Sequence, residues 1–295
     1  MHLGNGAITP ECAAMTLSAA ALGLGAAAAS LRHEPMSRQK LALAAGLGAL
    51  VFAAQAVNVP VLPGTSAHLV GGVLLAWMLG PSLGAWTMAI VLAVQALVLG
   101  DGGLAALGAN VLNMALLPGG CVAVCRRAQM AEGRWSNAAC AMAAAVSVPL
   151  AALLIVGQTA LFRSGAELIG WQEFAAKMVA THLWIGLEEG GLTLALVAAI
   201  AALARTSWKP AVASSLGALA IAAFAFPWSS ALPDGYEVAV ESSGLGGWLA
   251  GGTGTLVHLS STLGEQGGLL VGMLLVGVLV AAISSSATPR QLSVG

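Results

Sequence analysis

The sequence predicts an all-α integral membrane protein, and its composition and its long apolar runs both lead to that prediction. Of its 295 residues, 58% are hydrophobic and only 8% are charged, whereas a soluble domain carries about 25% charged residues. Because so little charge cannot cover a water-facing surface, lipid must be the solvent for most of the chain. The net charge of −1 gives no indication of a nucleic-acid partner.

About nine apolar runs approach the roughly 20 residues that a helix needs to cross the hydrocarbon of a bilayer. The third run is short and Gly-rich and ends at Gly80-Pro81. We therefore expect there either a tilted crossing or a re-entrant piece lined by protein. The expected segments are 12–31, 40–58, 67–80, 82–99, 104–125, 137–162, 178–204, 211–228 and 266–284.

The basic residues predict the orientation of these segments. If the N-terminus lies outside, nine of the eleven Lys and Arg residues fall in cytoplasmic loops, which is the distribution that the positive-inside rule favours. We therefore expect a multi-pass protein of the cell (inner) membrane with its N-terminus outside and its C-terminus in the cytoplasm. The nine are Arg32, Arg38, Lys40, Arg126, Arg127, Arg134, Arg205, Lys209 and Arg290, and the other two are Arg163 and Lys177.

A change in composition near residue 209 predicts two modules. Seven segments with short loops precede it, and two segments joined by a long outside loop, about 229–265, follow it. That loop is rich in Gly and Ser with little hydrophobic periodicity, so we expect no independent core in it. The predicted domains are a membrane domain over 1–208 and a two-helix module over 209–295.

The first two residues form a candidate metal chelator. No basic stretch precedes the first apolar run, which begins only after Glu11, so we predict no signal peptide and a mature terminus at Met1. The terminal amine of Met1, together with the amide nitrogen and the imidazole of His2, can bind one ion in two fused chelate rings. Such planar nitrogen ligation suits Ni(II) or Cu(II) and also takes Co(II). On its own, a His at position two is a weak signal.

His68 is the candidate for the fourth ligand. It follows Pro63-Gly64 where the predicted outside loop enters the third segment, so the topology places it on the same face as Met1. An ionisable residue at membrane depth suggests a functional site. The alternative is an interfacial His bonded to the backbone. With Met1 and His2 on the same face and few other His residues, the metal-site interpretation is favoured.

Two amides and one acid lie at the outer start of the fifth segment. Asn110 and Asn113 are three residues apart and therefore share a helix face. They could hold the ligating imidazoles by hydrogen bonds, or they could join helices to one another, and the two readings are equally supported. Asp101 could attract cations or cap the start of the helix, and the cap is favoured.

The seventh segment carries His182 and Glu189, which are seven residues apart and so lie on one helix face. Acids inside a membrane are expensive and are seldom without a role. The two residues could form a polar clamp near the metal or a proton relay, or they could only fix helix packing. The sequence contains no phosphate-binding loop, nucleophile elbow or zinc-protease motif, so we do not expect an enzyme.

Several separated motifs together resemble the CbiM/NikM family, the substrate-specific components of energy-coupling factor (ECF) transporters for cobalt and nickel. They occur in family order and span about 1–205. Residues from about 209 are similar to the small partner module of the NikN/CbiN or PDGLE type, with Tyr at the Leu position of that signature. The motifs are Met1-His2, Leu62–Gly72 (LPGTSAHLVGG), Gly100–Asn110 (GDGGLAALGAN), His182–Glu189 (HLWIGLEE) and Pro233–Glu237 (PDGYE).

The resemblance implies a seven-helix substrate component joined to a two-helix C-terminal module. It implies Ni(II) or Co(II) as the transported ligand, bound near the outer face by nitrogens of Met1, His2 and His68. It also implies two kinds of partner, a transmembrane coupling (T) component and cytoplasmic ATPases. The chain departs from the family after His2, where members commonly continue as Ile-Pro-Asp-Gly-Phe and this sequence has LGNGAITP.

The sequence therefore predicts the metal-capturing subunit of an ATP-driven uptake transporter. Two other functions remain open at this stage. One is a membrane sensor that binds metal without transporting it. The other is a proton-coupled permease centred on His182 and Glu189, for which the N-terminal metal site would be irrelevant.

Overall fold

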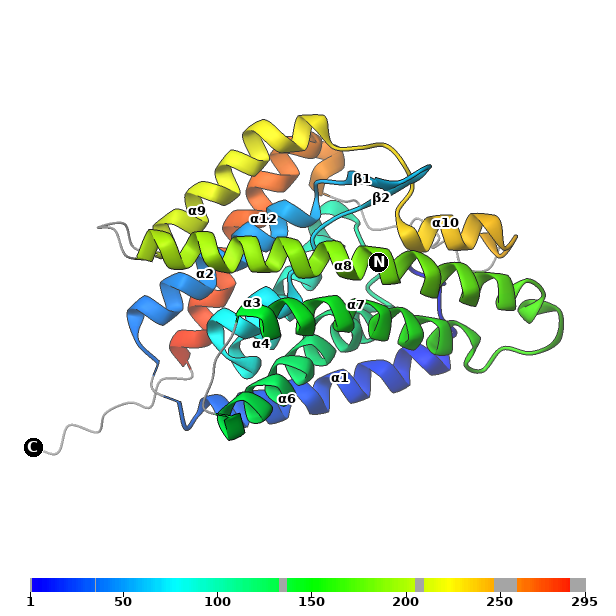
Figure 1. Cartoon of the computed structure of the whole chain (residues 1–295). Coiled ribbons are helices and arrows are strands. Elements are labelled where there is room, and N and C mark those ends of the chain that lie inside the picture. The colour runs from blue at the N-terminus through cyan, green and yellow to red at the C-terminus, as the bar shows by residue number, and fades with distance from the viewer. Residues whose placement is uncertain (1, 35, 133–136, 205–209, 247–258, 287–295) are drawn as a thin grey trace, which may run out of the picture.

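The computed structural model describes residues 2–34, 36–132, 137–204, 210–246 and 259–286. Its helices form a bundle in which the long elements run between two ends of the molecule (Figure 1). They are α1 (Pro10–Leu31), α2 (Arg38–Gln55), α3 (Gly72–Leu79), α4 (Pro81–Val94), α5 (Leu107–Val111), α6 (Leu117–Glu132), α7 (Asn137–Ala160), α8 (Trp171–Ala204), α9 (Pro210–Ala220), α10 (Gly235–Ser242) and α12 (Leu259–Ser286). Three π-helical turns, η1 (Gln95–Leu99), η2 (Leu112–Leu116) and η4 (Ile221–Ala225), extend or join them.

Seven helical stretches of the described residues are long and apolar enough to cross a membrane, and this confirms the predicted multi-pass α-helical class. They are Pro10–Leu31, Pro81–Leu99, Leu107–Ala128, Asn137–Ala160, Trp171–Ala202, Pro210–Trp228 and Gly264–Ala282.

Two of the nine expected segments are not among the seven. The run at 40–58 forms α2, but Arg38 and Lys40 occupy its first turn and lower its apolar character. The run at 67–80 contains only the eight residues of α3, which extend about 12 Å at 1.5 Å per residue. Because the hydrocarbon core is about 30 Å thick, α3 cannot cross it alone.

A β-hairpin precedes α3 and was not anticipated. Strands β1 (Val59–Leu62) and β2 (Thr65–Ala67) pair antiparallel, and Gly64 at the turn has a φ of +74°, which glycine adopts without a steric cost. The hairpin leads into residues 68–71, so the chain enters α3 through irregular backbone. Such backbone is tolerated at membrane depth only where protein or a cavity surrounds it.

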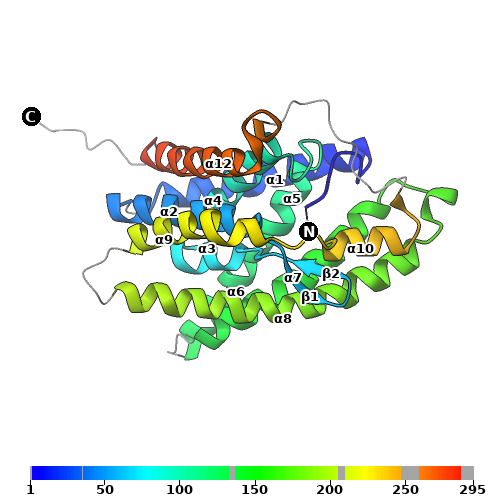
Figure 2. The same cartoon turned by 90° about the horizontal axis from the view of Figure 1, so that it is seen from above.

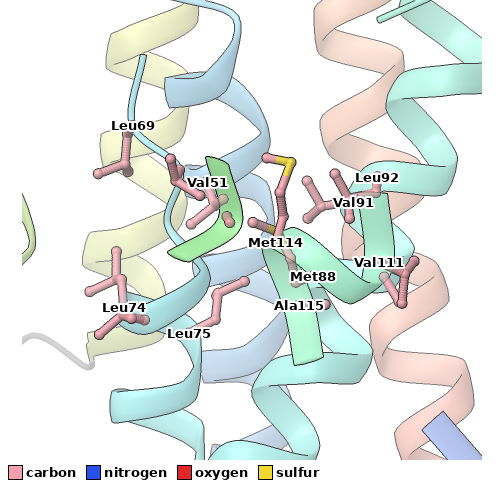
Figure 3. Packing of buried hydrophobic residues seen from close by; sticks show 14 of the residues in the cluster. Val51, Leu69, Leu74, Leu75, Met88, Val91, Leu92, Val111, Met114 and Ala115 are labelled. Atoms are coloured by element: carbon pink, nitrogen blue, oxygen red, sulfur yellow. The ribbon is translucent and has the colours of Figure 1, made fainter. Parts of the chain in front are cut away.

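The helices approach one another closely at small residues. A Cβ added to Gly186 or Gly190 of α8 would lie 2.5 and 2.8 Å from backbone oxygens of α7. Close approach at small residues is how membrane helices associate when lipid is as apolar as their side chains. Between the helices is one continuous apolar cluster, and Figure 3 shows the part where α2, α3, α4 and η2 meet.

The C-terminal helices do not stand apart from the rest of the bundle. Both α9 and α12 pack against α2, and α10 lies with the β-hairpin at the same end of the molecule (Figures 1 and 2). The predicted boundary near 208–209 falls outside the described residues, so the division into two modules stays a prediction. The loop expected at 229–265 contains α10, which begins with a capping box between Asp234 and Glu237.

Candidate metal centre

The N-terminal segment, residues 2–9, reaches into the molecule before α1 begins. Leu3 is fully buried, and three hydrogen bonds hold its backbone. Its N–H donates to Oδ1 of Asn110 at 2.9 Å, and its carbonyl accepts from Nδ2 of Asn110 at 3.1 Å and from the backbone N–H of Gly103 at 2.8 Å. The Asn110 side chain therefore binds both the backbone N–H and the backbone carbonyl of Leu3, the residue that follows His2.

Glycines allow this close approach. A Cβ on Gly103 would lie 2.3 Å from the backbone nitrogen of Asn5, and Gly102 has a φ of +86°. The side chain of Asn5 in turn accepts a hydrogen bond from the backbone N–H of Ala105 at 3.1 Å. The Gly-rich loop at 100–104 thus forms a cradle whose shape fits the backbone of the N-terminal segment.

The two predicted histidine ligands meet in the structure. The rings of His2 and His68 are stacked, with centroids 5.4 Å apart and planes at 18°. Nδ1 of His68 lies 3.0 Å from the carbonyl oxygen of Leu69, which can only accept. Nδ1 therefore carries the proton, and Nε2 is left as the lone-pair nitrogen that can bind a metal.

Both histidines are neutral at physiological pH. Burial is the main cause that lowers the pKa of His2 from 6.5 to about 3 and the pKa of His68 to about 4, and nearby positive charge adds to the lowering. Metals bind imidazole through its unprotonated nitrogen. The site therefore holds both rings in the state that ligation requires.

Asp101 faces His2, with 3.2 Å between its Oδ1 and the Nδ1 of the imidazole. The expectation that it caps the following helix is wrong, because α5 begins only at Leu107 and has no side-chain cap. Burial raises the pKa of the Asp101 carboxyl above its usual value. Of the two roles weighed for this residue, attraction of a cation fits its position.

Asn113 makes a different set of contacts from Asn110. Its amide and that of Gln158 in α7 form a reciprocal pair, at 2.8 Å from Nδ2 to Oε1 and 3.0 Å from Nε2 to Oδ1. Both side chains are buried. This pair joins η2 to α7, as a hydrogen bond between membrane helices does. The proposal that Asn113 also supports a metal ligand stays a prediction.

Glu189 holds the loop that carries His68. Its two carboxylate oxygens accept the backbone N–H groups of Val70 and Gly71, each at 2.8 Å. These are free donors at the start of α3, where a carboxylate is favoured. Glu189 therefore connects α8 to the backbone two residues beyond His68.

His182, one of the other predicted site residues, bonds within its own helix and also reaches the site. Its Nδ1 lies 2.7 Å from the carbonyl oxygen of Met178. The ring borders a small cavity together with His68 and Asp234. His182 therefore stands beside one candidate ligand.

A cavity of about 460 Å³ opens next to the two histidine ligands. Four acids line it, Asp101 from the N-terminal part of the chain and Asp234, Glu237 and Glu241 from the C-terminal part. Such a wall raises the local concentration of cations. Its other lining residues include His2, His68, Gln55, Asn58 and Tyr236.

Sequence reasoning missed two residues near the site, Gln55 and Gln95. Each is buried inside an apolar run, and a polar residue in such a run is itself a signal of function. Met1, the third predicted ligand residue, lies outside the described residues. No cluster of three or more His, Cys, Asp or Glu side chains that could hold a metal occurs in the described ranges, and the predicted ligand set of two imidazoles with an amine and an amide does not need one.

Comparison with known proteins decides the family. Residues 2–207 match CbiM, described as the cobalt uptake substrate-specific transmembrane region. The chain belongs to this family. CbiM membership places it among multi-pass membrane transport components and not among enzymes, and it confirms the resemblance found in the sequence.

Individual relatives of this CbiM-family chain carry cobalt, nickel or general metal transport names. It is 40% identical over 169 residues to a putative fused nickel transport protein NikMN of Archaeoglobus fulgidus, a match that covers 56% of this chain and 55% of the relative. It is 33% identical over 206 residues to a putative metal transport protein of Haloquadratum walsbyi, covering 68% and 90%. Matches to the fused nickel proteins thus span about half of their length or less.

A solved structure shares the fold. The crystal structure of a truncated transition metal transporter superposes with a TM-score of 0.60 at 28% identity, and the match covers 68% of this chain and 99% of that one. The fold of the CbiM region is therefore that of a transition metal transporter.

Proposed function

We propose that the protein captures Ni(II) or Co(II) at the outer face of the cell membrane, as the substrate-specific component of an ATP-driven ECF-type uptake transporter. One observation carries the proposal. The two neutral imidazoles of His2 and His68 lie stacked beside an acid-lined cavity, at the point where the N-terminal segment enters the molecule.

The ligand set follows from the chemistry of the two histidines. An ion held by the terminal amine and the amide nitrogen of His2 closes its second chelate ring through Nδ1 of the same residue. Nε2 of His68 is then the fourth nitrogen, because its Nδ1 is used by Leu69. Four nitrogens in a plane suit Ni(II), and Co(II) is also accepted.

Asp101 occupies the position that the arriving ion would take near Nδ1 of His2. Its carboxylate is therefore placed to attract the cation and then to give up its contact with the ring. The acids of the cavity wall act earlier, by raising the local concentration of divalent ions.

The remaining parts of the proposal concern topology and partners. The distribution of Lys and Arg supports an outer N-terminus and a cytoplasmic C-terminus. Family membership supports a transmembrane coupling component and cytoplasmic ATPases as partners. Residues 209–295 would form a two-helix module of the NikN or PDGLE type, and the nickel names of the fused relatives support that reading.

The decisive experiment measures Ni(II) and Co(II) binding by calorimetry on purified protein with a native Met1, and on the same protein with two residues added before Met1. The addition moves the amine and shifts His2 to position four, so the amine, the amide and the imidazole can no longer bind one ion in two fused rings. We expect micromolar or tighter binding by the native form and loss of most of that affinity in the extended form. Equal binding by both forms, or binding by neither, would overturn the proposed site.

The two other functions are separable from this one. A sensor would bind metal in the same assay but would support no metal uptake when it is combined with a coupling component and ATPases. A permease centred on His182 and Glu189 would lose transport on substitution of those residues while metal affinity at the N-terminus stayed unchanged.

A further inference from the structure

Nε2 of His2 and Oε1 of Gln95 are among the buried polar atoms that lack a hydrogen bond in the described part of the chain. The Gln95 side chain lies close enough to the His2 imidazole to influence its pKa. A buried polar atom without a partner costs about 1–3 kcal/mol, so two such atoms on neighbouring side chains, one able to donate and one able only to accept, point to a bond that forms when the site is loaded.

The orientation of the Gln95 amide is fixed by a chain of donors. The carbonyl of Val70 can only accept, so Nε2 of Gln55, at 2.6 Å, must be the donor to it. Oε1 of Gln55 then accepts from Nε2 of Gln95 at 2.7 Å. Because the two amides are aligned in this way, Oε1 of Gln95 is the atom left for His2.

An acceptor at that position selects one form of the imidazole. Nε2 of His2 must carry the proton to bond with Gln95, so Nδ1 is left with its lone pair. Nδ1 is the nitrogen that closes the second chelate ring. We propose that Gln95 is a positioning residue that accepts the Nε2–H of His2 and thereby presents Nδ1 of His2 to the metal, with Gln55 holding Gln95 in place.

The local backbone supports this role. Gln95 opens the π-helical turn η1 at the end of α4, and π-turns inside helices occur frequently at functional sites. The Gln95 side chain is fully buried, and Gln55 is nearly so. Burying a polar side chain costs free energy unless it forms hydrogen bonds. A hydrogen bond from His2 to Oε1 would therefore account for the presence of a buried Gln95.

The same chain of amides joins the two halves of the ligand set. It runs from His2 through Gln95 and Gln55 to the carbonyl of Val70, whose N–H is held by Glu189. The spacing between the His2 ring and the His68 loop is therefore set by side chains of α2, η1 and α8. The two histidines are predicted to use opposite nitrogens, Nδ1 in His2 and Nε2 in His68.

The role of Gln95 as a positioning residue rests on the proposed function, but one test of it needs no metal. In the metal-free site Asp101 places an acceptor oxygen 3.2 Å from Nδ1 of His2, so the test uses an Asp101→Ala variant, which removes that acceptor. In this metal-free variant labelled with ¹⁵N-histidine, nitrogen chemical shifts report which ring nitrogen carries the proton, and an added His2→Ala substitution identifies the His2 signals. We expect a proton on Nε2 of His2. A proton on Nδ1 of His2 would overturn the inference, whatever the protein transports.

A second test uses Gln95→Leu, with Gln158→Leu as the matched control, since both replace a buried membrane glutamine. Residues that orient metal-bound imidazoles typically contribute 10- to 100-fold in affinity. We expect Gln95→Leu to weaken Ni(II) binding by about that factor and, in the metal-free Asp101→Ala background, to shift the His2 proton to a mixture of both nitrogens. Gln158→Leu should lower the melting temperature with metal affinity unchanged.

The outcomes separate the two proposals. If the native protein binds Ni(II) and Gln95→Leu binds it equally, the proposed function stands and the inference is wrong. If the native protein does not bind, the proposed function fails, and the metal-free spectrum alone decides the role of Gln95. Gln55→Leu, which removes only the support, should give the same spectral change in weaker form.

Discussion

The two segments that carry the histidine ligands are held in different ways. The N-terminal segment is fixed by the shape of the glycine cradle and by the clamp of Asn110 on Leu3. The loop after His68 is fixed by buried side chains, through Glu189 on one side and Gln55 on the other. A chain end has a covalent tether on one side only, so close-fitting walls must restrict it. A loop with two tethers needs its backbone donors and acceptors to be satisfied.

The comparison predicts that Ni(II) affinity is most sensitive to added side-chain volume in the glycine cradle around the N-terminal segment. Gly103→Ala would place a methyl group 2.3 Å from the backbone nitrogen of Asn5, and backbone cannot move aside as a flexible side chain can. We expect Ni(II) affinity to fall by about 100-fold, near the upper end of what residues supporting a metal ligand contribute. Gly120→Ala, where the added methyl meets nothing within 4 Å, is the control. Equal affinity of the two variants in calorimetry would show that the cradle does not position the chelate.

The next largest effect is expected at Asn110, because a single side chain provides both hydrogen bonds to Leu3. Asn110→Ala should weaken Ni(II) binding by about 30-fold, within the range for residues that support metal ligands. Asn113→Ala is the matched comparison, since its amide pairs with Gln158. It should lower the thermal midpoint and leave affinity within about twofold. A larger loss of affinity in Asn113→Ala than in Asn110→Ala would reverse the roles assigned to the two amides.

A smaller loss of Ni(II) affinity is expected from changes at the His68 loop, because both Glu189 and Gln55 hold its backbone. In Glu189→Gln, one acceptor oxygen remains and an NH₂ group faces a backbone donor, at a cost of about 1–3 kcal/mol. We expect about tenfold weaker Ni(II) binding, measured by calorimetry on the purified variant. Unchanged affinity with abolished uptake in reconstituted vesicles would instead favour the proton-coupled permease.

The smallest effect is expected where α10 meets α8. A methyl on Gly235 would lie 2.8 Å from Cδ1 of Ile185 and 3.0 Å from Cε1 of His182, both of them side-chain atoms, which shift at lower cost than the backbone does. Gly235→Ala should therefore change Ni(II) affinity by only about two- to threefold, equivalent to less than about 1 kcal/mol. Gly191→Ala, with nothing within 4 Å, serves as the reference. A loss as large as that of Gly103→Ala would mean that α10 is part of the ligand cradle.

Much of the centre could be predicted from the sequence because its ligands are unusual residues in an apolar chain. His2 and His68 stood out by type and by predicted side of the membrane, and the structure brings their rings together. Glu189 stood out as a membrane acid, although its partners on the backbone of the His68 loop could not be foreseen. Such contacts depend on how α8 packs against α3.

Other features were beyond the reach of sequence patterns. Strands of three and four residues are too short to show an alternating pattern, so the β-hairpin was taken as part of the outside loop between two apolar segments. Asp101 was expected to cap a helix that in fact begins six residues later, at Leu107. Gln55 and Gln95 were overlooked because single polar residues within long apolar runs do not alter the prediction of a helix.

The contact between the C-terminal region and the β-hairpin has a consequence for assembly. The backbone N–H of Ser66 donates to the carbonyl of Pro233 at 2.8 Å, and that of Ser230 donates to the carbonyl of Asn58 at 2.8 Å. This contact adds to the packing of α9 and α12 against α2, and within one chain it forms at an effective concentration in the millimolar range or above. The acidic wall that α10 adds to the cavity is therefore present in every copy at a fixed ratio of one to one, whatever the expression level of the protein.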